Sequence, residues 1–119
     1  MRRTFTARAV AFWVDEKLNF KALAMAEEEH SGERLDIQRA LVDDEQDREL
    51  GQDTYCLVDE YATVIYGGIT RWELENGELR LDLTAEASQV LDAGVGYTIL
   101  VPDLDHQTVI RDALPELLI

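Results

Sequence analysis

The densest group of side chains that could bind or catalyse lies between residues 43 and 53. This acidic loop (DDEQDRELGQD) contains only Arg48 as a basic residue, beside the carboxylates of Asp43, Asp44, Glu45, Asp47, Glu49 and Asp53. Such carboxylates bind cations, but an EF-hand loop needs alternating oxygen ligands around a central glycine, and Gly51 does not fit that pattern. Three interpretations stay open: a cation site, a solvated acidic loop, and a contact surface for a basic partner.

The other reactive side chains show no catalytic spacing. His30 and His106 lie far apart in the chain, and Cys56 stands beside apolar residues without an adjacent base. Asp47, Glu49 and Asp53 offer the carboxylates of a hydrolase, but nothing in the sequence fixes their separation. No nucleophile elbow or phosphate-binding glycine loop is present. We therefore expect a protein that is not an enzyme, with no catalytic residues, no metal and no cofactor.

The charge of the chain narrows the class of partner. Its 119 residues include 25 acidic and 11 basic ones, which gives a formal net charge of −14. Nucleic acids and anionic membranes are bound through clusters of Lys and Arg, so neither is an expected partner. A basic protein is the expected partner instead. The single cysteine suits a reducing compartment, and no signal peptide or membrane span is visible, so we expect the cytoplasm.

Alternating apolar residues predict a hairpin at the start of the chain. Residues 4–14 alternate as one strand, and a second alternating run begins at Leu18. A two-residue turn at Asp15-Glu16 predicts these pairs: Trp13 with Leu18 and Ala9 with Ala22. The shared apolar face is rich in alanine, which leaves room for a closely packed helix. We expect a helix to cover this face.

The clearest local signal is Asn76-Gly77, a dipeptide typical of type I′ hairpin turns. A two-residue turn there pairs apolar residues on one face and opposite charges on the other. The predicted pairs are Leu74 with Leu79, Trp72 with Leu81, Glu73 with Arg80 and Arg71 with Asp82. Agreement between both faces indicates that this register is the real one.

The remaining elements complete one α+β domain over residues 1–119. Strands are predicted at 35–42, 54–58, 62–66 and 97–101, with a charged loop at 27–34 and a bend at Gly67-Gly68. Thr84 is expected to cap a helix that runs to about Ala93, with Ala87, Val90 and Leu91 on one side. A last helix begins after Asp103 or Asp105, carries the stripe Val109, Ile110, Ala113 and Leu114, and ends or kinks at Pro115. The prediction is a mostly antiparallel sheet of five to seven strands with two helices in the C-terminal third.

Three tyrosines follow the acidic loop within a few residues, namely Tyr55, Tyr61 and Tyr66. Tyrosine adds rigid, partly apolar area to protein interfaces, but it also packs well within sheets. Strand alternation alone does not say which sheet face stays open. We place Tyr55 and Tyr66 with the acidic loop as candidate partner-binding residues.

Four short motifs resemble the immunity protein 10 family. They are Asp44-Glu45-Gln46-Asp47, Glu49-Leu50-Gly51, Asp53-Thr54-Tyr55 and Tyr66-Gly67-Gly68-Ile69, and the resemblance extends over nearly the whole chain. It implies an α+β antidote of bacterial polymorphic toxin systems, which binds and blocks a cognate toxin domain and is a monomer or a weak homodimer. Glu27-Glu28-Glu29, the alanine-rich early strands and Pro115 depart from the family pattern, which leaves the identity of the toxin open.

Two other functional classes stay open beside the immunity interpretation. A small-molecule or metal binding module needs a concave pocket with convergent polar groups. An assembly subunit without catalysis needs a self-complementary surface.

Overall fold

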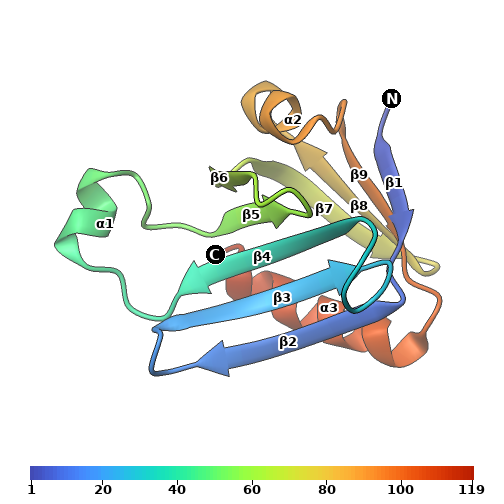
Figure 1. Cartoon of the computed structure of the whole chain (residues 1–119), viewed down its shortest axis with the longest axis horizontal. Coiled ribbons are helices and arrows are strands. Elements are labelled where there is room, and N and C mark those ends of the chain that lie inside the picture. Colours follow the sequence, from blue (N-terminus) through green and yellow to red (C-terminus); the bar gives the residue numbers. More distant parts are fainter.

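Two β-sheets and three helices make up the computed structural model, which describes residues 1–119 (Figure 1). The antiparallel five-stranded sheet has the order β2 (Ala9–Asp15), β3 (Phe20–Ala26), β4 (Arg34–Ala40), β5 (Cys56–Asp59), β6 (Val64–Tyr66). The four-stranded sheet has the order β1 (Arg3–Thr6), β9 (Gly96–Leu100), β8 (Glu78–Leu83), β7 (Ile69–Glu75), and only its β1–β9 pair is parallel. The helices are α1 (Glu45–Glu49), α2 (Ala85–Leu91) and α3 (Leu104–Leu117). The predicted α+β class is confirmed, with 9 strands in two sheets where five to seven in one were expected.

One hydrophobic core joins both sheets and α3. From the five-stranded sheet it takes Leu23, Met25, Leu35, Ile37 and Leu57, and from the four-stranded sheet Phe5, Leu79, Leu81, Tyr97 and Ile99. Helix α3, predicted from its apolar stripe, adds Ile110, Ala113, Leu114 and Leu117. In Figure 1 this helix lies behind β2 and β3. The inner face of the five-stranded sheet is therefore covered.

The predicted first strand is two strands in different sheets. The chain leaves β1 at Ala7 and enters β2 after Arg8, while the Ala7 N–H donates to Leu100 O at 2.8 Å and the Arg8 N–H to Ala26 O at 3.0 Å. Ala7 is fully buried, whereas Ala11 is exposed, although both belong to the same alternating series. Alternation continues across the break, so periodicity alone does not reveal the change of sheet.

The predicted turn at Asp15-Glu16 is wrong by two residues. Asp15 pairs with Phe20, so that Trp13 lies opposite Ala22 and Ala9 opposite Ala26, and Leu18 is 71% exposed. The Asp15 carboxylate accepts a hydrogen bond from the Leu18 N–H at 2.9 Å, and Asn19 adopts φ 57°. Asp and Asn both stabilise turns in this way, because their short side chains bond the backbone and tolerate left-handed φ.

The helix expected on the alanine-rich face covers the opposite face instead. Two basic side chains of the inner face fix the end of α3: the Lys21 ammonium pairs with Glu116 at 3.1 Å, and Arg39 donates to Leu117 O at 2.9 Å. The inner face carries Leu and Met, which offer more apolar area for burial than alanine does. The alanine-rich face is therefore left uncovered by the chain.

The Asn76-Gly77 hairpin is confirmed in every predicted pair. Asn76 has φ 53° and Gly77 φ 74°, the left-handed values that a type I′ turn requires. The bend at Gly67-Gly68 is also confirmed, and it carries the chain from β6 to β7 in the other sheet. A Cβ at Gly68 would lie 2.7 Å from the Ala87 Cβ, so glycine is needed there.

Both predicted C-terminal helices are present, with small differences at their ends. Thr84 caps α2 through the Ala87 N–H at 3.1 Å, and the helix ends at Leu91. Its buried residues are Ala87, Ser88 and Leu91, so the predicted apolar side is wrong at Val90, which is exposed. Asp103 caps α3, and the helix continues past Pro115 to Leu117, so Pro115 does not end it.

Candidate interaction surface

The acidic loop connects β4 to β5 and projects from the end of the five-stranded sheet (Figure 1). It contains the short helix α1, which the sequence analysis missed. Asp44 caps this helix: its carboxylate accepts from the Asp47 N–H at 2.7 Å, and the Asp47 carboxylate accepts from the Asp44 N–H at 3.1 Å. This reciprocal capping box has a spacing of three residues that is readable in the sequence. Two of the candidate carboxylates therefore shape the loop.

The other carboxylates of the acidic loop are available to a partner. Glu45, Glu49 and Asp53 are exposed, while Asp43 is half-buried. None of them forms an ion pair within the chain. No three His, Cys, Asp or Glu side chains of the protein come together in an arrangement that would hold a metal ion. Their charge is thus uncompensated on the projecting loop.

Of the two candidate tyrosines, only Tyr66 lies beside the acidic loop at the surface. Tyr66 is 41% exposed and lines a cavity of about 170 Å³ together with Asp47 and Cys56. Burial raises the pKa of Tyr66, and the neighbouring acidic groups of Cys56 and Asp47 raise it further. Tyr55 is buried, and its hydroxyl accepts from the Ile69 N–H at 2.9 Å. The Tyr55 side chain therefore belongs to the core in this conformation.

The uncovered side of the five-stranded sheet, here the open face, is mainly apolar. Its residues follow from the strand register in four rows, which are Ala9-Ala26-Arg34, Ala11-Ala24-Asp36-Val58-Val64, Trp13-Ala22-Gln38-Cys56-Tyr66 and Asp15-Phe20-Ala40. Trp13 is 40% and Val64 48% exposed, at opposite edges of the sheet. Ala9, Ala11, Ala24 and Ala26 line a groove of about 300 Å³ at the β2 edge of this face, together with Val10 and with His106 of α3. Sequence alternation grouped these alanines correctly but assigned them to the wrong side.

One ion pair lies within the open face. Arg34 binds both carboxylate oxygens of Asp36, at 2.9 and 3.0 Å. Burial raises the pKa of Asp36, although Arg34 acts in the opposite direction. The open face therefore carries the Arg34–Asp36 ion pair among mainly apolar residues.

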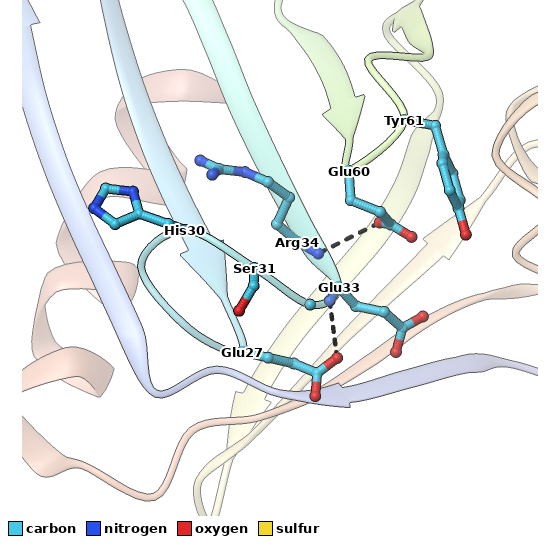
Figure 2. Close-up of a pocket in the computed structure, with 8 residues that line it drawn as sticks. Glu27, His30, Ser31, Glu33, Arg34, Glu60 and Tyr61 are labelled. Carbon is cyan, nitrogen blue, oxygen red and sulfur yellow. Dashed lines mark hydrogen bonds between the residues drawn. The ribbon is translucent and has the colours of Figure 1, made fainter.

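A second acidic segment lies at the opposite end of the sheet. The loop of residues 27–33 turns at Gly32 and, with Glu60 and Tyr61, encloses a cavity of about 650 Å³ (Figure 2). Its wall is polar, because Tyr61 is the one hydrophobic residue among its lining residues. The Glu27 carboxylate accepts from the Glu33 N–H at 2.8 Å and holds the loop closed. From the sequence, this segment was predicted only as a charged loop.

Comparison with known proteins identifies the chain. The sequence profile of the family described as Immunity protein 10 matches residues 6–109. The chain belongs to the immunity protein 10 family. The resemblance found in the sequence is thus confirmed, and an immunity role with a toxin as partner follows in general terms. No curated protein and no solved structure matches the chain.

The helices of this immunity protein are short or amphipathic. None of them is long and apolar enough to cross a membrane.

A cluster of ion pairs around Arg3 connects the two sheets of the immunity protein. Arg3 of β1 is the cation, and its guanidinium contacts Glu33 at 3.1 Å, Asp59 at 3.4 Å, Leu91 O at 2.8 Å, the Tyr97 hydroxyl at 3.1 Å, and Glu60. The Asp59 carboxylate also accepts from the N–H groups of Tyr61 and Thr63, both at 3.0 Å. We call these side chains the Arg3 cluster. Its carboxylates are already paired, so they serve the fold of the immunity protein.

We expect the stability of the immunity protein to fall between about pH 10 and pH 12 because of Tyr97. Burial raises the pKa of Tyr97 to about 12 although Arg3 lowers it. Between the usual pKa of about 10 and this value, the unfolded chain loses the Tyr97 proton while the folded protein keeps it, so stability decreases as pH rises. The loss amounts to about 2 to 3 kcal/mol. Urea unfolding at several pH values, with Tyr97→Phe as the control, measures it. An equally steep loss in Tyr97→Phe would contradict the assignment.

Proposed function

We propose that this immunity protein neutralises a basic toxin domain by binding it through the acidic loop. The single observation that carries this proposal is the group of uncompensated carboxylates on the projecting loop, in a member of a toxin antidote family. The formal charge of −14 adds a long-range attraction for a basic partner.

The mode of action is exclusion of the toxin's substrate. A nuclease domain carries a basic groove for phosphate, and an acidic protein that occupies the same field keeps nucleic acid out. The immunity protein needs no catalysis for this task, and it acts as a monomer or weak homodimer in the cytoplasm, where the toxin would otherwise attack its own cell.

Neutralising the acidic loop is expected to slow association with the toxin. The variant Glu45→Gln, Glu49→Gln, Asp53→Asn removes three exposed charges and leaves the capping residues of α1 intact. Long-range attraction chiefly sets the association rate, so we expect that rate to fall by about 10-fold at low salt and its salt dependence to weaken. Surface plasmon resonance measures both rates with the toxin domain encoded beside the immunity gene.

A matched control carries the same change of charge elsewhere. Glu75→Gln, Glu86→Gln and Asp112→Asn are exposed and lie on β7, α2 and α3. We expect this variant to keep most of the association rate. Equal slowing in both variants would mean that net charge alone matters, and an unchanged rate in the loop variant would remove the loop from the mechanism.

A further inference from the structure

We propose that the open face of the five-stranded sheet is the apolar centre of the toxin interface, with acidic segments as its rim. This inference rests on the proposed function and extends it from the acidic loop to a whole surface. The occupant is a surface of the toxin domain that presents apolar side chains flanked by Lys and Arg.

The composition of the open face is unusual for a sheet side in water. Antiparallel sheets that cover a core on one side normally carry polar residues on the other. Here the middle row runs Ala11-Ala24-Asp36-Val58-Val64, with a single charged member that Arg34 neutralises. Ala11, Trp13, Val64 and Tyr66 are exposed on this face, whereas Ala22, Ala26 and Cys56 are buried in it. Exposed apolar residues that gather on one face indicate a binding surface.

No element of the protein is placed to cover the open face. Lys21 and Arg39 hold the end of α3 on the inner face, and both project from strands of the same sheet. Helix α2 packs on β8 in the other sheet. In Figure 1 the loop of residues 27–33 lies at one end of these strands, and no helix lies in front of β2, β3 and β4 on the side away from α3. The open face is therefore available to another molecule.

The form of the open face suits inserted side chains. Trp13 packs edge-on against Phe20, with ring centroids 6.4 Å apart and an interplanar angle of 83°, so its position is fixed. Tyr66 lies in the same row as Trp13 on the opposite edge strand. The row between them holds Ala22, Gln38 and Cys56. The groove of about 300 Å³ lies beside this row, where Ala9, Ala11, Ala24 and Ala26 line it. Exposed aromatic residues such as Trp13 and Tyr66 are typical of the residues that dominate binding energy.

The charges at both ends of the open face select the partner. Asp47 of the acidic loop lies beside Tyr66, and Glu29 of the 27–33 loop lines the groove next to Ala26. An apolar centre with a charged rim is the usual anatomy of an interface. A second copy would bring another net charge of −14 and acidic segments against this rim, which like-charge repulsion disfavours. A basic partner meets attraction at both ends instead.

The test places an arginine within the open face. Ala11 is exposed in the middle row, so an arginine there can extend to solvent without disturbing the core. We expect Ala11→Arg to weaken toxin affinity by about 30-fold or more, chiefly through faster dissociation, since it places a long charged side chain within the apolar part of the contact. Trp13→Ala is expected to weaken it by about 10-fold or more. Thermal unfolding confirms that each variant is folded.

Ala85→Arg is the matched control. Ala85 is exposed on α2, and this substitution makes the same chemical change away from the open face. We expect its toxin affinity to stay within about threefold of wild type, as for a surface change outside the contact. Isothermal titration calorimetry compares the variants with the toxin domain encoded beside the immunity gene.

The outcomes separate the two proposals. Binding by wild type together with equal binding by Ala11→Arg and Trp13→Ala would overturn the open-face inference alone. No binding by wild type would overturn the proposed function and this inference with it. Sedimentation of the isolated protein provides a third outcome: a tight dimer that Ala11→Arg dissociates would assign the open face to self-association and overturn the inference.

Discussion

Replacing Arg3 by methionine is expected to lower the free energy of unfolding by about 3 to 5 kcal/mol. The guanidinium is the one cation among Glu33, Asp59 and Glu60, and the Asp59 side chain is only 3% exposed. Methionine keeps much of the apolar stem of Arg3 but leaves the buried Asp59 carboxylate without its cation. An uncompensated buried charge destabilises the folded state strongly. Urea unfolding near neutral pH measures the loss.

Arg71→Met is the matched control for this prediction. Arg71 pairs with Glu73 at 3.6 Å but is 73% exposed, so the pair is solvated and its loss is expected to cost about 0.5 kcal/mol or less. Combining Arg3→Met with Asp59→Asn should recover part of the loss, because the uncompensated charge is removed. Similar losses in Arg3→Met and Arg71→Met would show that the Arg3 cluster contributes no more than a surface pair.

Leu81→Ala is expected to lower the free energy of unfolding by about 2 to 5 kcal/mol, whereas Glu73→Ala is expected to lower it by about 0.5 kcal/mol or less. Leu81 is fully buried in the central strand β8, whereas Glu73 lies on the exposed side of the same hairpin. Trp72, opposite Leu81, is half-buried, so Trp72→Ala should lie between them. Denaturant midpoints for the three variants measure the order. Equal losses would contradict the hairpin register.

Local signals predicted the elements whose chemistry is complete within a few residues. Asn76-Gly77 gave the hairpin in its true register, and Thr84 and Asp103 began their helices as predicted. The Asp15-Glu16 turn failed because the competing four-residue loop depends on a side-chain bond from Asp15 and the left-handed φ of Asn19. Neither is visible in an alternating pattern.

Local sequence patterns did not predict which strands belong to which of the two sheets. Residues 4–14 alternate without a break, yet Ala7 turns into the core and Ala11 faces out, since the chain changes sheet between them. The same limit applies to the candidate site. The acidic loop was predicted from composition. The position of the open face depends on which side of the sheet α3 covers. The burial of Tyr55 goes with its hydrogen bond to Ile69, which joins segments that are distant in the pattern. Such choices are set by tertiary packing.

The parallel pairing of β1 with β9 sets the order in which a newly synthesised chain can fold. Arg3 aligns with Tyr97, so the four-stranded sheet stays open until β9 has left the ribosome. The five-stranded sheet needs only residues 9–66 and can pair earlier, but its inner face waits for α3. Strand pairs so far apart in sequence form slowly. The immunity protein therefore closes both sheets only after nearly the whole chain has been synthesised, and a chain truncated before β9 would lack the central pairing of the four-stranded sheet.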